Sequence, residues 1–352
     1  MRPGSGEGGS GSPGKPRRFS GKRAPRSPGG RHPALGYLFR RLPFVLFLTI
    51  LLPGWETETQ RPLVSYQRDI VRHLTGGAEI APGITLEDRA SPRSRELTRR
   101  YLEEELRSLG LEPRRQAYRE EGANVYALLR ANAEEEDEED ERAPGGSPPE
   151  TAEPRRTPPR SDEYVVIGAH LDSVERSPGA SDNATGCAAV LGVARHLVSL
   201  EGRVRNVYFV FFDEEERGLI GSRAFAQMLR DEGRTVVAVH TVDQMGWDAD
   251  EDGAVELEVP YEGAEELYRR AAEASGFEGA IHTTRETGSD HAAFRRLGFP
   301  AVGLTEEYRG GDTTPHIHRP SDTWETVDFE YLARATRLFR TAAAMLVRNA
   351  GG

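Results

Sequence analysis

Three short stretches in the middle of the chain combine side chains that can bind a divalent metal ion. A His-x-Asp pair, His170 and Asp172, follows the apolar run YVVIG, and the acidic run DEEE (213–216) follows the apolar run VYFVFF. Between them, Asp182 lies just ahead of an Ala-rich helical pattern. Imidazole and carboxylate groups are ligands that zinc accepts. The pattern therefore predicts a metal site, to which the rest of the chain must add further ligands and a scaffold.

Alternating strand and helix patterns are expected to position these side chains. The predicted strands are 123–131, 164–168, 207–212, 236–242 and 300–304, and the predicted helices are 62–76, 94–110, 184–200, 220–232, 263–275 and 328–348. Ser94 is the expected N-cap of the second helix and Gly110 its C-terminal stop. The alternation predicts an α/β fold whose sheet has a parallel core and helices on both faces.

Sheets of this kind bind ligands beyond the carboxyl ends of their strands. Five acidic and imidazole residues fall there, close to the ends of three different predicted strands: His170, Asp172, Glu215, Glu216 and Asp243. This common placement supports one shared site independently of any single motif.

Charge is distributed unevenly along the 352 residues. Residues 1–55 hold ten Lys or Arg and one Glu, a charge of +9, whereas the whole chain carries −11, so residues 56–352 carry −20. This acidic balance argues against a nucleic-acid partner, which requires a basic face. The single cysteine, Cys187, excludes an intramolecular disulfide and is expected to be a small buried residue.

The N-terminal region differs in composition from the rest of the chain. Residues 1–37 are rich in Gly, Pro, Ser and Arg and are expected to form a disordered basic leader. Within 38–55, two arginines precede an apolar run of about a dozen residues, which is shorter than the ~20 needed to span a membrane. The segment is typical of a signal peptide or an N-terminal membrane anchor. We therefore expect an exported protein that is secreted, periplasmic or anchored by this segment, with no other membrane contact.

The remaining residues, 56–352, are expected to form a single domain with one interruption. Residues 132–162 contain the run EEEDEEDE followed by Pro-, Gly- and Arg-rich sequence, without any periodicity. Such a stretch is expected to be a disordered acidic insertion at the surface, between two strands.

Six motifs in a fixed order carry a resemblance to a known family. They are GAHLDS (168–173), PGASDNATG (178–186), EERGLIGS (215–222), VDQMG (242–246), GSDHAAF (288–294) and HRPSDT (318–323). In this order they resemble the co-catalytic di-zinc aminopeptidases, which include secreted bacterial leucyl aminopeptidases, glutamate carboxypeptidase and, as an inactive relative, the transferrin receptor ectodomain. The resemblance covers roughly residues 62–348, apart from the insertion. It implies a zinc-peptidase fold: a three-layer sandwich with a mixed, mostly parallel central sheet flanked by helices.

The resemblance also implies two zinc ions per chain and a ligand set. Asp182 would bridge the two ions, His170 and Asp243 would complete one site, and Glu216 and His318 would complete the other. A bridging carboxylate suits this chemistry because it offers one oxygen to each of two ions about 3.5–4 Å apart.

Two further roles follow from the resemblance. Glu215 would be the general base, and Asp172 would orient the ring of His170. The neighbouring acidic residues Asp213 and Glu214 are expected to be solvated or structural. A shift of one residue in this register is the main alternative.

Other histidines and acidic residues have competing interpretations. His316 could replace His318 as a ligand, but the HxxxDT spacing favours His318. Asp290 and His291 would line or support the site in the resembling family, although purely local bonding is an equal alternative. His196 and His240 are expected to lie in the core or at the surface. The segment DRASPRS (88–94) departs from a Gly-Arg pair often found there in the family, which affects scaffold only.

These observations favour a metallo-aminopeptidase that acts on peptides with a free N-terminus. One alternative is an enzyme similar to glutaminyl cyclases, which use one zinc; the uninterrupted EERGLIGS disfavours it. The other is a non-catalytic, receptor-like relative, which the complete ligand set and base disfavour. The sequence makes no prediction of oligomeric state or of the preferred substrate side chain.

Overall fold

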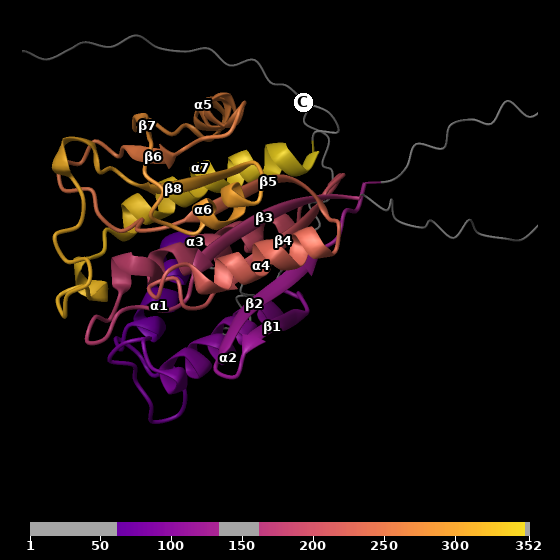
Figure 1. Ribbon diagram of the computed structural model, residues 1–352. Coiled ribbons are helices and arrows are strands. Elements are labelled where there is room, and N and C mark those ends of the chain that lie inside the picture. The colour runs from indigo at the N-terminus through magenta and orange to yellow at the C-terminus, as the bar shows by residue number, and fades with distance from the viewer. Residues whose placement is uncertain (1–61, 134–161, 349–352) are drawn as a thin grey trace, which may run out of the picture. The chain divides into compact units, whose positions relative to one another are not determined.

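The computed structural model describes residues 62–133 and 162–348 (Figure 1). Its strands are β1 (Pro113–Arg119), β2 (Gly122–Leu129), β3 (Glu163–His170), β4 (Asn206–Phe212), β5 (Thr235–Val242), β6 (Val255–Glu258), β7 (Ile281–Thr284) and β8 (Ala301–Glu306). These described residues form one eight-stranded sheet in the order β1-β2-β4-β3-β5-β8-β6-β7.

The sheet is mixed, with a parallel centre. Strands β4, β3, β5 and β8 run parallel to their neighbours in that row, and β6 pairs in parallel with β7. Antiparallel pairing joins β1 to β2, β2 to β4 and β6 to β8. The predicted mixed, mostly parallel sheet is therefore confirmed. The carboxyl ends of β3, β4 and β5 meet at one edge, where the candidate ligands were expected.

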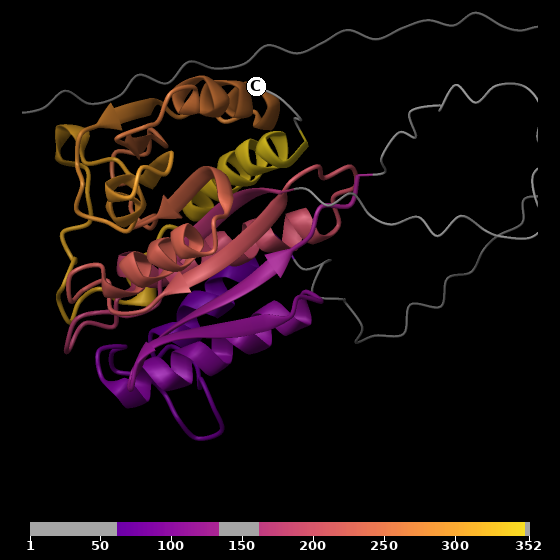
Figure 2. The same cartoon turned by 45° about the vertical axis from the view of Figure 1, so that its right-hand side comes forward.

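Helices cover both faces of the sheet (Figures 1 and 2). They are α1 (Leu63–Leu74), α2 (Pro92–Ser108), α3 (Thr185–Val198), α4 (Ile220–Asp231), α5 (Ala264–Ser275), α6 (His291–Arg296) and α7 (Phe329–Arg348). The larger core joins one face of the sheet to α1, α2, α3, α5 and α7, and the smaller core joins the other face to α4 and α6. The three-layer arrangement predicted from the sequence is confirmed.

Strand β4 shows why these residues form the centre of the sheet. Val207, Phe209 and Phe211 pack into the larger core, whereas Tyr208, Val210 and Phe212 pack into the smaller one. Successive side chains of a strand point to opposite faces, so an uninterrupted apolar run is required where both faces are covered. The same burial fixes the position of residues 213–216, which follow the strand directly.

The prediction that Ser94 caps the second helix is wrong. Helix α2 begins at Pro92, and its N-cap is Ser91, whose hydroxyl accepts a hydrogen bond from the Ser94 backbone N–H at 3.1 Å. Proline fits the first helical turn because its fixed φ is helical and no N–H is required there. Ser94 instead completes a capping box at the third position of the helix.

Four short elements were not predicted. Strand β1 (PRRQAYR) is largely polar because it lies at the sheet edge, and β6 (VELE) and β7 (IHTT) have four residues each. Helix α6 has only six residues. Such short elements contain too few periods of an apolar pattern to be distinguished from loops.

Several predictions fall outside the described residues. They are the leader at 1–37, the apolar segment at 38–55 and nearly all of the insertion at 132–162. Within 62–133 and 162–348, no helix has the length and apolarity needed to cross a membrane.

Candidate metal centre

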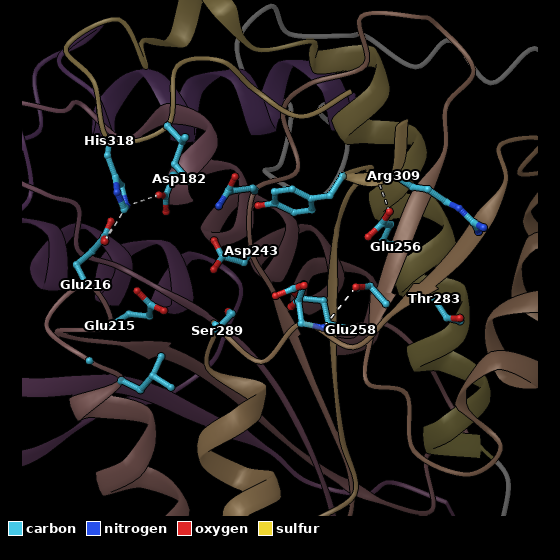
Figure 3. A pocket seen from close by; sticks show the side chains of 18 residues that line it. Asp182, Glu215, Glu216, Asp243, Glu256, Glu258, Thr283, Ser289, Arg309 and His318 are labelled. Carbon is cyan, nitrogen blue, oxygen red and sulfur yellow. Dashed lines mark hydrogen bonds and ion pairs between the residues drawn. The ribbon is translucent and has the colours of Figure 1, made fainter. Parts of the chain in front are cut away.

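Five predicted ligands converge from different elements, and Figure 3 shows four of them: Asp182, Glu216, Asp243 and His318. His170 ends β3, Glu216 follows β4, and Asp243 follows β5. Asp182 lies in η1 (Ala180–Ala184), a short turn before α3, and His318 lies in the segment between β8 and α7. The strand ends and the turn therefore bring together residues that are up to 148 positions apart in the chain.

Asp182 joins these ligands into two groups. In the first, Nε2 of His170 lies 3.2 Å from Oδ1 of Asp182 and 3.3 Å from Oδ1 of Asp243. In the second, Nε2 of His318 lies 3.1 Å from Oδ2 of Asp182 and 3.0 Å from Oε2 of Glu216. Within each group the potential ligand atoms lie within 4.8 Å of one another. Asp182 thus directs one oxygen to each group, as a bridging carboxylate would.

The donor set fits divalent zinc. It consists of imidazole nitrogens and carboxylate oxygens; His170 and Asp182 are buried, Glu216 and Asp243 are partly buried, and His318 is exposed. The buried Oε1 of Glu216 has no hydrogen-bond partner. Buried carboxylates facing one another are costly unless a cation neutralises them. The arrangement is therefore suited to one cation in each group.

The backbone around Asp182 is held by a second carboxylate. Asp322, from the HRPSDT motif, accepts hydrogen bonds from the backbone N–H groups of Ser181 at 2.8 Å and Asp182 at 3.2 Å. On the other side, the Asn183 amide donates to the Val242 carbonyl at 2.8 Å. The peptide bond between Asp182 and Asn183 is cis. These contacts tie the turn to the segments that carry His318 and Asp243.

Asp172 lies beside His170 but makes its hydrogen bonds elsewhere. Its carboxylate accepts the backbone N–H groups of Glu215 at 3.1 Å and Glu216 at 3.3 Å. Nδ1 of His170 lies 3.2 Å from the Asp172 carbonyl oxygen and 3.5 Å from Oδ1 of its carboxylate. Asp172 is thus in contact with the ring that it was predicted to orient, and it also fixes the turn that presents Glu215 and Glu216.

The electrostatics of the site favour bound cations. Burial, reinforced by the charges of Asp290, Asp243 and Asp172, raises the pKa of Glu215 to about 10. Burial and the Asp182 carboxylate raise the pKa of Glu216 to about 8. A dication placed among these groups would reverse both shifts, because positive charge stabilises a carboxylate.

The two histidines are also shifted. Burial alone would lower the pKa of His170, but the nearby carboxylates raise it well above its ordinary value. The hydrogen bond to Asp182 is the main cause that raises the pKa of His318 to about 9. Both rings therefore occupy a strongly negative environment, which also attracts a metal ion.

The other residues considered from the sequence lie apart from the two groups. Asp213 and Glu214 are fully buried and paired with arginines, so of the two expected alternatives, solvated or structural, the structural one applies. Nδ1 of His316 lies 2.9 Å from the Ser321 hydroxyl, and His316 belongs to neither ligand group. His240 is buried between the hydroxyl groups of Tyr261 and Tyr268, at 2.9 Å from each.

Three remaining residues have mixed outcomes. Asp290 is buried near the site, and burial together with Asp243 and Asp172 raises its pKa to about 7. Cys187 is buried, as predicted, and its thiol lies 3.2 Å from the His170 carbonyl oxygen. His196 is half-buried on α3.

Two residues that support the site were missed. Glu306 accepts backbone hydrogen bonds from Gly246 at 3.0 Å and Thr314 at 2.8 Å, and so links the segments after β5 and β8. Arg89 is fully buried and donates to the carbonyl oxygens of Leu171 at 2.8 Å and Gly179 at 2.9 Å. Their partners are backbone atoms, which leave no signal in sequence spacing. The position of Glu306 at a strand end was the available clue.

A cavity of about 900 Å³ begins at the two ligand groups. Asp182, Glu215, Glu216 and His318 line one end, and β6 and β7 line the other, with Asp243 between them (Figure 3). A space of this size accommodates a small molecule or the end of a peptide.

Comparison with known proteins places these features in context. The family model described as Peptidase family M28 matches residues 154–343. Leucine aminopeptidase 1 of Ajellomyces dermatitidis is 30% identical over 203 residues, which cover 51% of this chain and 52% of that protein. A probable leucine aminopeptidase of Arthroderma benhamiae is 31% identical over 195 residues, covering 51% and 53%. The chain thus spans about half the length of these relatives.

Solved structures show the same fold. The LapA aminopeptidase of Legionella pneumophila superimposes with a TM-score of 0.65 at 18% identity, covering 83% of this chain and 74% of that one. BSAP, a zinc aminopeptidase from Bacillus subtilis, gives 0.53 at 24% identity, covering 64% and 50%. A glutaminyl cyclase of Porphyromonas gingivalis gives 0.59 at 16% identity, covering 81% and 98%.

Proposed function

Because this chain belongs to peptidase family M28, we propose that it is a zinc-dependent aminopeptidase that removes the first residue of peptides with a free N-terminus. One observation carries the proposal: two ligand groups share Asp182, and the carboxylate of Glu215 lines the cavity beside them. The leucine aminopeptidases among its relatives support the same activity.

We assign one zinc ion to His170, Asp182 and Asp243, and a second to Asp182, Glu216 and His318. When bound, such a pair supplies Lewis acidity toward the scissile carbonyl and makes water more acidic. Asp322 and Asp172 hold the backbone of the ligands, through Ser181 and Asp182 and through Glu215 and Glu216. Asp322 and Asp172 therefore contribute by holding the metal ligands in fixed positions.

Glu215 is the residue we assign to proton transfer. Its carboxylate lines the cavity but belongs to neither ligand group. A carboxylate in that position can accept a proton from the attacking water and return it to the departing amine. The positive charge of nearby metal ions would bring its raised pKa down toward the working range. Asp290 is a buried neighbour whose charge acts in the opposite direction.

Zinc dependence and zinc number test this proposal together. Purified protein treated with a chelator should lose hydrolysis of leucyl-aminomethylcoumarin and regain it when zinc is returned. Atomic emission should find two zinc ions per chain. One zinc ion per chain together with cyclisation of N-terminal glutamine, or no bound zinc and no hydrolysis, would contradict the assignment.

Asp182 gives a sharper test of the pair. Asp182→Asn removes a charge and one good donor oxygen from both groups, so we expect at least one zinc ion to be lost. His318→Ala should weaken mainly the group that contains Glu216. Circular dichroism controls for folding. A folded Asp182→Asn protein that retains two tightly bound ions would contradict the bridging role.

We also propose that the segment 38–55 directs export, on the basis of its composition: an apolar run behind two arginines. Expression of the full chain followed by cell fractionation tests this. The protein should appear outside the cytoplasm, and deletion of 38–55 should retain it inside.

A further inference from the structure

The end of the cavity away from the ligand groups is lined by carboxylates. Glu256 and Glu258 alternate along β6 with Val255 and Leu257, which pack into the core, so both glutamates are on the cavity face. Glu286, just after β7, joins them. Figure 3 shows Glu256 and Glu258 on the opposite side of Asp243 from Asp182, Glu216 and His318. We call Glu256, Glu258 and Glu286 the acidic end.

Glu258 is a nearly buried carboxyl group in this wall. The residue is 6% exposed, and its buried Oε2 lies 3.3 Å from a ring nitrogen of His291. Gly303 on the paired strand β8 leaves the space that this carboxylate occupies, since a Cβ there would collide with it. A buried carboxylate without a cation beside it is costly, and a cation in the cavity would remove that cost.

The nearest side chain does not supply a cation. Nδ1 of His291 lies 3.3 Å from Oε2 of Glu258. Nε2 of His291 donates to the Glu286 carbonyl at 3.2 Å, and burial lowers the pKa of the ring to about 4. The ring is therefore neutral, with a lone pair on Nδ1 facing the carboxylate. The ring can accept a hydrogen bond from a protonated Glu258, but it carries no positive charge that could pair with the carboxylate.

No neighbouring arginine neutralises the acidic end. Among the described residues that line the cavity, Arg309 is the one arginine and lysine is absent. The Arg309 backbone N–H donates to Oε1 of Glu256 at 2.7 Å, but its guanidinium reaches His282, with Nη1 and Nδ1 3.4 Å apart. Burial, with the charges of Asp243, Glu286 and Glu256, raises the pKa of Glu258 to about 8. A cation bound at the acidic end would reverse this shift and pair with the charged carboxylate.

The orientation of an aminopeptidase substrate determines which part of it reaches the acidic end. With the scissile carbonyl at the ligand groups, the rest of the peptide must extend to solvent. The side chain of the first residue then points into the remaining cavity, past Asp243. The apolar lining residues Leu219 and Ile317 lie close in sequence to Glu216 and His318, at the ligand end. A leucine side chain would instead meet carboxylates.

We propose that the acidic end binds the cationic side chain of an N-terminal lysine or arginine, so that the enzyme prefers basic first residues. This inference rests on the proposed aminopeptidase activity. The ammonium or guanidinium group pairs with the carboxylate of Glu258, and the charges of Glu256 and Glu286 add to the attraction. The hydroxyl groups of Thr283 and Thr284, which also line this end, accept further hydrogen bonds.

Matched substrates test the preference on the zinc-loaded wild-type protein. Lysine and norleucine differ by the ammonium group, and arginine and citrulline differ mainly by charge. With aminomethylcoumarin derivatives of these four residues, we expect kcat/KM to be about 10- to 100-fold higher for the charged member of each pair, the range of one charge-assisted hydrogen bond. Equal or higher values for the neutral members would overturn the proposal.

A single-residue change locates the preference. Glu258→Gln should reduce the lysine-to-norleucine ratio of kcat/KM by about 10-fold or more. Glu278→Gln removes the same charge from an exposed position that does not line the cavity, and should leave the ratio unchanged. An equal loss for lysine and norleucine in Glu258→Gln would overturn the proposal, because it would indicate contact with the shared α-amine.

Inhibition of the wild-type protein keeps the test valid if Glu258→Gln does not fold. Lysine hydroxamate and norleucine hydroxamate share the metal-binding group and differ in side-chain charge. We expect the lysine compound to bind about 10-fold or more tightly, and equal inhibition constants would overturn the proposal. Failure to hydrolyse any of the four substrates with zinc bound would instead refute the aminopeptidase activity itself.

Discussion

Four consecutive acidic residues, 213–216, divide into two pairs with opposite surroundings. Asp213 is fully buried, with Oδ1 2.8 Å from Nε of Arg95 and Oδ2 2.7 Å from Nη1 of Arg99. Glu214 lies 3.0 Å from Arg95 and also contacts Arg119. These arginines, from α2 and β1, neutralise the first pair, which we call the arginine-paired carboxylates.

The second pair, Glu215 and Glu216, has no arginine partner among the described residues. The chain reverses between the pairs because Glu214 adopts a positive φ of 61°. Asp172 then holds the N–H groups of Glu215 and Glu216 toward the ligand groups. The comparison teaches that buried carboxylates are structural where the protein supplies the cation, and indicate a site where it does not.

Replacing one carboxylate in each pair with its amide should give the largest difference in kcat between two variants. Glu215→Gln keeps the shape of the side chain but cannot accept a proton, so kcat should fall by about 10²–10⁴-fold with zinc still bound. Glu214→Gln should leave turnover per folded molecule nearly unchanged and lower the melting temperature, because it weakens the contacts to Arg95 and Arg119. Steady-state kinetics with zinc analysis measures both.

The reverse result has a definite meaning. If Glu214→Gln lost turnover while Glu215→Gln retained it, the base would be assigned one residue too late. Circular dichroism of both proteins separates a loss of chemistry from a loss of folding.

Removing an arginine should destabilise the structural pair. Arg95→Met would leave Asp213 and Glu214 buried without their shared cation, at a cost of about 3–5 kcal/mol in the free energy of unfolding. Arg217→Met is the matched control: it also contacts Glu214, but its side chain is 46% exposed, so we expect a loss of about 1 kcal/mol or less. Urea unfolding measures both values. Similar losses for Arg95→Met and Arg217→Met would show that burial of the arginine does not determine how much its ion pairs stabilise the fold.

Much of this contrast could be predicted from the sequence, but not all of it. The apolar runs of β3, β4 and β5 predicted strands whose ends bring His170, Glu215, Glu216 and Asp243 together. The division of 213–216 came from a family motif, since four adjacent carboxylates look alike in composition. The arginines of α2 and β1 that pair with Asp213 and Glu214 are 95 to 119 residues away, on elements whose packing the sequence does not show.

The acidic end of the cavity had no sequence signal. Glu256 and Glu258 lie on a four-residue strand too short to be predicted, and their shared face appears only once β6 pairs with β8. The same applies to the second role of Asp172, whose carboxylate binds backbone N–H groups of a distant turn.

Asp172→Asn should disturb the second pair, Glu215 and Glu216, without affecting the arginine-paired carboxylates. Asparagine retains one oxygen acceptor, but its NH₂ group would face the N–H of Glu215 or Glu216. We expect zinc affinity or kcat to fall by about 10–100-fold, as for other residues that orient metal ligands. The free energy of unfolding of the chelator-treated protein should change less than in Arg95→Met. Unchanged kinetics and zinc content would show that the turn holds its place without Asp172.

The smallest expected effect is a pH dependence that separates the two pairs. The pKa of Glu216 is raised from 4.5 to about 8, mainly by burial, and that of His318 from 6.5 to about 9, mainly by its bond to Asp182. Both groups bind a proton more tightly in the folded state than in the unfolded state. Their contribution to stability is therefore complete below the unfolded pKa and is lost as the pH rises through the folded one. Between pH 6.5 and 8.5, the melting temperature of chelator-treated protein should fall.

Asp213, one of the arginine-paired carboxylates, should add little in that window. Burial raises its pKa from 3.8 to about 6, so its contribution to stability is lost as the pH rises between those two values and changes little above pH 6.5. Bound zinc should oppose the fall in melting temperature. Its ligands must lose their protons to bind it, so the affinity for zinc rises with pH. The gain in melting temperature on adding zinc should thus be larger at pH 8.5 than at pH 6.5 in wild type, and the difference should shrink in His318→Ala. A zinc-free melting temperature that rises across this window would show that the proton-binding groups are not those of the metal centre.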